Sequence, residues 1–128
     1  SRLPTSAEPR VGLRLGLRLR LLARRCARSL GGAASEASAR DLAAGAWALA
    51  SLSLHDEAAV QCLSRAAAAG IATFGPLDLA QLSWSFATLL HEEPALFHAI
   101  AEEATRRQHE LSPRAFANLA WSFTKLRL

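Results

Sequence analysis

The stretch "SPRAFANLAWSFTKLRL", residues 112–128, decides the fold, because two earlier stretches repeat it without a gap. The stretch "GPLDLAQLSWSFATLLH", 75–91, matches it at seven of 17 positions, and "SARDLAAGAWALASLSL", 38–54, matches the second at six. Each stretch begins 37 residues after the previous one. Fixed periods of this size are typical of stacked repeat architectures.

The first helix of each unit is predicted from its opening residues. Ser38, Gly75 and Ser112 occupy the N-cap position, where a serine oxygen accepts a hydrogen bond from the backbone. Pro76 and Pro113 follow at the first helical position, where the missing N–H has no intrahelical partner to lose. We therefore expect three helices that begin at equivalent places.

A second helix is predicted between these stretches. It begins after Asp56 in the first unit and after Glu93 in the second, with Pro94 at its first position. Apolar residues recur there with a helical period. They are Ala59, Val60, Leu63 and Ala67, then Leu96, Phe97, Ile100 and Ala104.

The sequence thus predicts an all-α fold, an α-solenoid of stacked antiparallel helical hairpins with a 37-residue repeat. The units are 38–74, 75–111 and a partial one, 112–128, after a basic segment, 1–37. Alanine and leucine dominate the composition, which favours helix. The chain opens on serine and stops where a further helix is due, so we expect it to be part of something longer.

The positive charge is confined to the N-terminal segment. Residues 1–37 hold eight arginines and two acids, a net +6, whereas residues 38–128 hold seven basic and nine acidic groups, a net −2. The part from 11 to 30, "VGLRLGLRLRLLARRCARSL", is rich in arginine, poor in acids and amphipathic as a helix. Such composition is typical of a mitochondrial or plastid presequence. A cap helix followed by a linker at Gly31-Gly32, or a basic arm that binds RNA, remain alternatives.

One stripe along the first helices is polar and varies between units, with spacings of four, four and three residues. A fixed apolar frame with one variable polar stripe favours a surface that contacts something different at each unit; a solvated helix face is the alternative. The stripe also includes Leu77, which favours a peptide partner. The candidate RNA-binding residues are Arg40, Gln81, Ser85, Thr88, Arg114, Asn118, Ser122 and Lys125.

The tryptophans Trp47, Trp84 and Trp121 lie beside this stripe. Each is flanked by Ala43 and Ala50 or by their equivalents, so we expect buried wedges between hairpins rather than platforms for bases. Recognition would then fall to the neighbouring Ser85 and to Gln81 one turn earlier.

The motifs "SPRAFANLAWSFTKL", "GPLDLAQLSWSFATL" and, less well, "SARDLAAGAWALASL" resemble those of organellar RNA-binding helical-hairpin repeats. These include the heptatricopeptide and octotricopeptide repeats and the leucine-rich region of FAST-kinase-like proteins, in which a RAP domain often follows. The resemblance covers about 38–128. The first unit departs from it at Ala44 and Gly45, where the others carry an amide and a leucine.

The resemblance implies binding of single-stranded organellar RNA in RNA processing, stability or translation, in the mitochondrion or alternatively the plastid. The alternative function is a protein–protein interaction scaffold with ribosomal or other protein partners. No phosphate loop, GxSxG or HExxH motif occurs, so we expect no enzyme activity, cofactor or metal. We also expect no membrane span, and self-association through the uncovered last helix.

Overall fold

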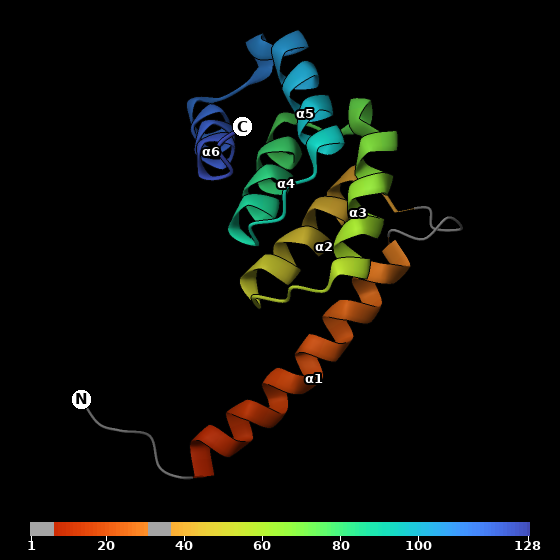
Figure 1. Cartoon of the computed structure of the whole chain (residues 1–128), viewed down its shortest axis with the longest axis vertical. Coiled ribbons are helices and arrows are strands. Elements are labelled where there is room, and N and C mark those ends of the chain that lie inside the picture. Colours follow the sequence, from red (N-terminus) through yellow and green to blue (C-terminus); the bar gives the residue numbers. More distant parts are fainter. Residues whose placement is uncertain (1–6, 31–36) are drawn as a thin grey trace, which may run out of the picture.

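The computed structural model describes residues 7–30 and 37–128, and this part of the chain is all-helical. This confirms the all-α prediction. Six α-helices and two 3-10 turns follow one another along the described chain (Figure 1). They are α1 (Ala7–Leu30), α2 (Ala39–Ser51), α3 (Glu57–Ala69), η1 (Ile71–Thr73), α4 (Pro76–Thr88), α5 (Pro94–Arg106), η2 (Gln108–Glu110) and α6 (Pro113–Lys125).

The predicted N-caps are confirmed for helices α2, α4 and α6. The hydroxyls of Ser38 and Ser112 accept from backbone amides in the first turn, at 3.2 and 3.1 Å. Gly75 caps α4 without a side chain, and Pro76 follows it. These three helices begin at 39, 76 and 113, which gives two intervals of 37 residues.

The same three helices also end alike. Ser53, Leu90 and Arg127 each adopt a left-handed conformation, with φ of 53°, 58° and 59°. At each end the following amide reaches back to a carbonyl in the last helical turn, for example from His91 to Phe86 at 3.0 Å. This closure satisfies carbonyls that the helix leaves unpaired and turns the chain toward the next helix.

The helices form two layers. Helices α2, α4 and α6 lie side by side in one layer, and α3 and α5 pack behind them in the other (Figure 1). The core between the layers is aromatic and aliphatic. Phe86 lies against Phe97, and Phe97 against Phe123, with edge-on ring geometry and centroids 6.5 and 5.2 Å apart.

Small residues line the contact between α2 and α4. Ala43, Ala46 and Ala50 of α2 are buried, as are Ala80 and Ser83 of α4. Short side chains let two helix backbones approach closely, and the Ser83 hydroxyl is satisfied by donating to the carbonyl of Leu79 in its own helix. Close, parallel first helices therefore follow from alanine and serine at the contact positions.

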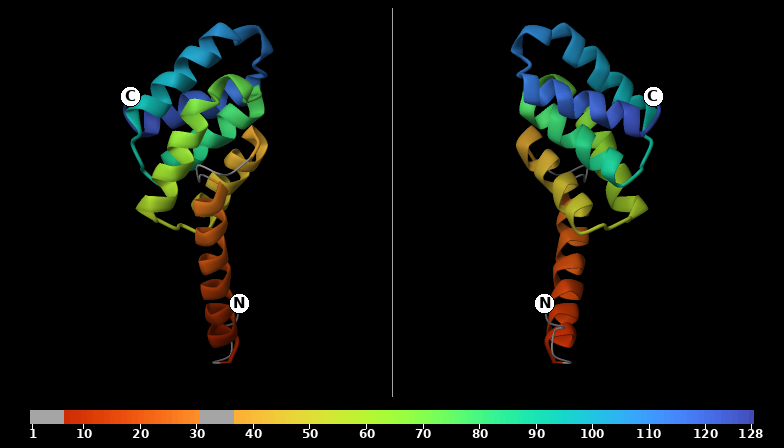
Figure 2. Two further views of the ribbon diagram at one scale, coloured as in Figure 1. Left: turned by 90° about the vertical axis from the view of Figure 1, so that its right-hand side faces the viewer. Right: turned by 90° about the vertical axis from the view of Figure 1, so that its left-hand side faces the viewer.

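Helix α1 packs against α2 and α3 only near its C-terminal end. Its other end projects away from the remaining helices (Figure 2). Ala27 is buried there, and Leu30 lies so close to Gly45 that a Cβ at that glycine would stand 2.9 Å from the Leu30 Cδ1 atom. The first unit thus lacks the leucine of its equivalents because α1 fills that space.

The joint between α1 and α3 is also electrostatic. Asp56 caps α3, accepting from the amide of Ala59 at 3.2 Å and from the guanidinium of Arg28 at 3.0 Å. Burial of the carboxylate raises the pKa of Asp56, but the Ala59 amide, Arg28 and Arg24 together outweigh it and lower the pKa below its ordinary value. Two arginines of the basic segment therefore neutralise a helix-capping acid.

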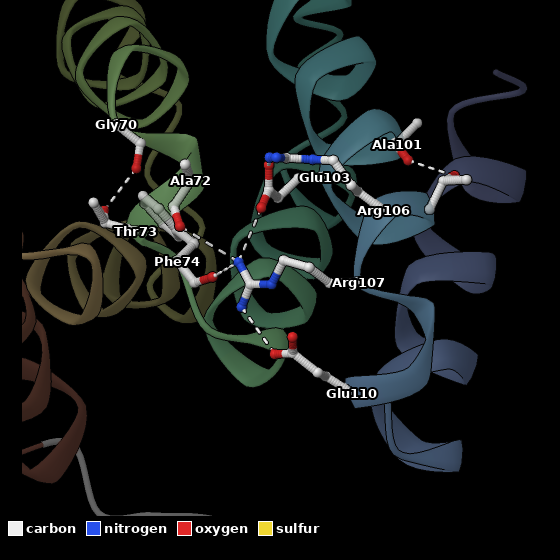
Figure 3. Close-up of polar contacts among 10 residues, drawn as sticks. Gly70, Ala72, Thr73, Phe74, Ala101, Glu103, Arg106, Arg107 and Glu110 are labelled. Carbon is white, nitrogen blue, oxygen red and sulfur yellow. Dashed lines mark hydrogen bonds and ion pairs between the residues drawn. The ribbon is translucent and has the colours of Figure 1, made fainter.

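Arg107 joins the end of the first hairpin to the second (Figure 3). Its Nη1 atom donates to the carbonyl of Phe74 at 2.6 Å and pairs with Glu103 at 3.1 Å, and its Nη2 pairs with Glu110 at 3.5 Å. Arg106 pairs with the same buried Glu103. Hydrogen bonds from Arg106 and Arg107 lower the pKa of Glu103.

Candidate nucleic-acid interface

The structure divides the predicted RNA-binding stripe into exposed, half-buried and buried residues. Arg40, Arg114 and Lys125 are exposed, while the amides Gln81 and Asn118 are half-buried at the surface of α4 and α6. Thr88 is half-buried too. Its hydroxyl oxygen is buried and has no hydrogen-bond partner within the described part of the chain.

Ser85 and Ser122 do not lie on that surface, contrary to expectation. Both are fully buried. Their hydroxyls donate to the carbonyls of Gln81 and Asn118 one turn earlier, at 2.8 and 2.7 Å. A serine satisfied by its own helix can be buried at little cost, so its polarity did not indicate exposure.

The tryptophans were expected to be buried, and this prediction is wrong for two of them. Trp47 is 50% exposed and Trp121 is exposed too, at 44%, while Trp84 is half-buried. One residue along a helix is a rotation of about 100°. Because of that rotation, Ser85 faces the packed side of α4 while the neighbouring Trp84 faces its open side.

The open side of α2, α4 and α6 therefore has a different membership from the predicted stripe. We call it the tryptophan face. Its members are Arg40, Ala44, Trp47 and Ser51; Leu77, Gln81, Trp84 and Thr88; Arg114, Asn118, Trp121 and Lys125. It contains three cations, two amides, three indoles and no acid.

A shallow hollow of about 410 Å³ lies at the middle of this face. Trp47 of α2 lines one side, and Gln81 and Trp84 of α4 lie along its middle. Arg114 and Asn118 of α6 line the other side. Side chains from three helices thus meet at a single depression.

The position of Gln81 in the hollow is held by a hydrogen bond. Its Nε2 atom donates to the carbonyl of Ala43 at 3.3 Å, across the contact between α4 and α2. Ala43 lies one turn before Trp47 on the same helix, so the bond holds the amide close to that indole. The amide oxygen remains available as an acceptor.

Most acids lie away from the tryptophan face. Glu57, Glu102 and Glu110 are exposed on or beside the second layer of helices. Asp41 and Asp78 lie in the first turns of α2 and α4, so acids are also present in the first layer, but neither belongs to the tryptophan face.

A second apolar surface lies on α6, on a side that no other described helix covers. Phe116 is 63% exposed, whereas Leu79, its equivalent on α4, is 1% exposed. Phe116, Leu119 and Phe123 line a hollow of about 600 Å³ together with residues of α5. The uncovered face predicted for the last helix is present.

Within residues 7–30 and 37–128 no group of histidine, cysteine and acidic side chains is arranged to hold a metal ion. His55 and His91 stack on one another with centroids 6.1 Å apart. No helix in the described part of the chain is both long and apolar enough to cross a bilayer.

No family model, curated protein or solved structure matches this chain.

Proposed function

We propose that this chain is an RNA-binding helical-repeat protein, whose tryptophan face contacts single-stranded RNA. The observation that carries the proposal is a row of three indoles, two exposed and Trp84 half-buried, beside cations and amides on a face whose members include no acid. Indoles stack on bases of any identity, cations neutralise phosphates, and amides hydrogen-bond base edges.

The proposal treats the helices as an α-solenoid with a 37-residue repeat. The equal intervals of helix starts, of caps and of left-handed end residues support it. Stacked hairpins place equivalent side chains in a row, so Trp47, Trp84 and Trp121 form a line of platforms along which a strand can run. The proposed role is binding in RNA processing, stability or translation, without catalysis.

We place the protein in the mitochondrion, with the plastid as the alternative. Support comes from the arginine-rich, acid-poor composition of α1 and its projection from the body. A fusion of residues 1–37 to a fluorescent protein tests the location, and diffuse fluorescence would contradict it.

RNA binding is tested by fluorescence anisotropy with a labelled single-stranded RNA of about 10 nucleotides at about 50 and 200 mM salt. Trp47→Ala, Arg114→Ala and Lys125→Ala are each expected to weaken binding. The arginine and lysine variants should also flatten the salt dependence, because each removes a phosphate contact. Arg65→Ala, on α3, is the matched control and should leave the affinity unchanged.

The second candidate is a protein–protein scaffold. Exposed Leu77 on the tryptophan face and the apolar hollow beside Phe116 favour it, since peptide grooves display aliphatic and aromatic side chains. An affinity for RNA that ignores both salt and the three substitutions would favour this candidate over the first.

A further inference from the structure

The hollow on the tryptophan face is lined by residues of three successive first-layer helices. Trp47 comes from α2, and Gln81, whose amide is bonded to the carbonyl of Ala43, comes from α4. Trp84 of α4 and Asn118 of α6 line the same hollow. The hydrogen bond to Ala43 therefore places the amide of the second unit close to the indole of the first.

Helix geometry explains why the first indole needs an amide from the following unit. Side chains lean toward the N-terminus of their own helix, so an indole covers the turn that precedes it. Positions 44, 81 and 118 lie in that turn on the three helices. In the first unit the position is Ala44, which offers no hydrogen-bonding group; the amide beside Trp47 is supplied by α4 instead.

We propose that one RNA base binds at the junction of the first two hairpins, stacked on Trp47 of α2 and hydrogen-bonded by Gln81 of α4. This rests on the proposed RNA-binding function. The first hairpin has no amide of its own beside Trp47, so it is insufficient to read this base alone.

The hydrogen bond from Gln81 leaves part of its amide for the base. The Nε2 atom gives one of its two N–H groups to the carbonyl of Ala43, so the Oε1 atom can accept from a base edge and the second N–H can donate to it. Arg114 lines the same hollow and is exposed, which places a cation where the phosphate that follows the base can reach it.

A double-mutant cycle on the full 128-residue chain tests this pairing, with the labelled RNA used above. Trp47→Ala is expected to weaken binding about tenfold, as stacking on one base does. Gln81→Met, which keeps the length of the side chain, should weaken it several-fold. If both contact one base, the double variant binds within about twofold of Trp47→Ala alone, whereas Trp47→Ala with Asn118→Ala multiplies the two losses.

A second cycle tests pairing within one hairpin. Trp84→Ala with Gln81→Met should multiply the two losses, because Gln81 shares its base with Trp47. Circular dichroism melting of every variant shows whether it remains folded. If the losses of Trp84→Ala and Gln81→Met fail to multiply, while those of Trp47→Ala and Gln81→Met do multiply, then one hairpin binds one base. That result would overturn the inference and leave RNA binding intact. A wild-type chain that binds no RNA at either salt concentration would overturn both.

Discussion

Equivalent positions on α4 and α6 should differ sharply in their contribution to stability. Leu79 is 1% exposed and Phe116 is 63% exposed, although both stand three residues after the proline at the start of their helix. Leu79→Ala removes a buried side chain and leaves a cavity, which typically costs about 3 kcal/mol. Phe116→Ala removes a ring of which only about a third is hidden, worth about 1 kcal/mol at most, and leaves no cavity.

Urea denaturation followed by far-ultraviolet circular dichroism measures both costs. With a slope of about 2 kcal/mol per molar urea, the midpoint should fall by about 1.5 M for Leu79→Ala and about 0.5 M for Phe116→Ala. The measurement is made at low protein concentration, where the uncovered face of α6 has no partner. Equal costs in a monomeric sample would show that α6 is covered, and would refute the reasoning.

Other substitutions test the joints of the fold. Leu90→Gly should raise the free energy of unfolding by about 0.5–1 kcal/mol, because the left-handed conformation strains leucine and the side chain is 62% exposed. In the control Leu89→Gly, the replaced leucine is buried and right-handed, so the free energy of unfolding should fall. Gly45→Leu should displace Leu30 and release α1, seen as faster tryptic cleavage at Arg24 and Arg28, whereas Gly45→Ala requires only a rotation of Leu30 and should not. The pKa of Glu103 is lowered from its ordinary value of 4.5, so its carboxylate stabilises the fold above pH 4.5 and this stability is lost as the pH falls below that value. Glu103→Gln should therefore be less stable at neutral pH, and its melting temperature should depend less on acid pH. An unchanged acid dependence would contradict this. Phe116→Ser should reduce any concentration-dependent self-association in gel filtration, and an unaltered profile would exclude this face as its cause.

Helix positions were predictable because their signals are local. Ser38, Ser112 and the two prolines mark helix starts through bonds made within a few residues, and the structure confirms them. The core stripe of the second helices was predictable for the same reason, since its 3.6-residue period is written in adjacent turns.

The composition of the candidate site was not predictable from local signals. Whether Trp84 or Ser85 faces outward depends on the direction from which α2 and α6 approach α4, and this is a property of three helices together. The flanking small residues favoured a buried tryptophan, but the buried side chains of α2 facing α4 are alanines, and helices that approach this closely leave no room for an indole between them. The serine fits there instead, with its hydroxyl satisfied at Gln81.

Gly45 illustrates the same limit. In the sequence it is only a departure from the pattern of the other units, and its cause lies 15 residues away at Leu30. A signal did exist in principle: an amphipathic segment before the first unit needs a surface without bulky side chains on which to pack.

The bonds of Arg107 affect how readily the molecule bends. They tie the turn at Phe74 to α5 on the side opposite the tryptophan face, through a guanidinium whose side chain is only 20% exposed. The equivalent residue one unit earlier, 37 positions before, is Gly70, which has no side chain to make such a tie. The joint between α3 and α5 should therefore be stiff at this turn, whereas α1 is held at the opposite end of α3, where Arg28 pairs with Asp56. If the proposed function holds, RNA lying across the first two hairpins would meet a fixed spacing between them.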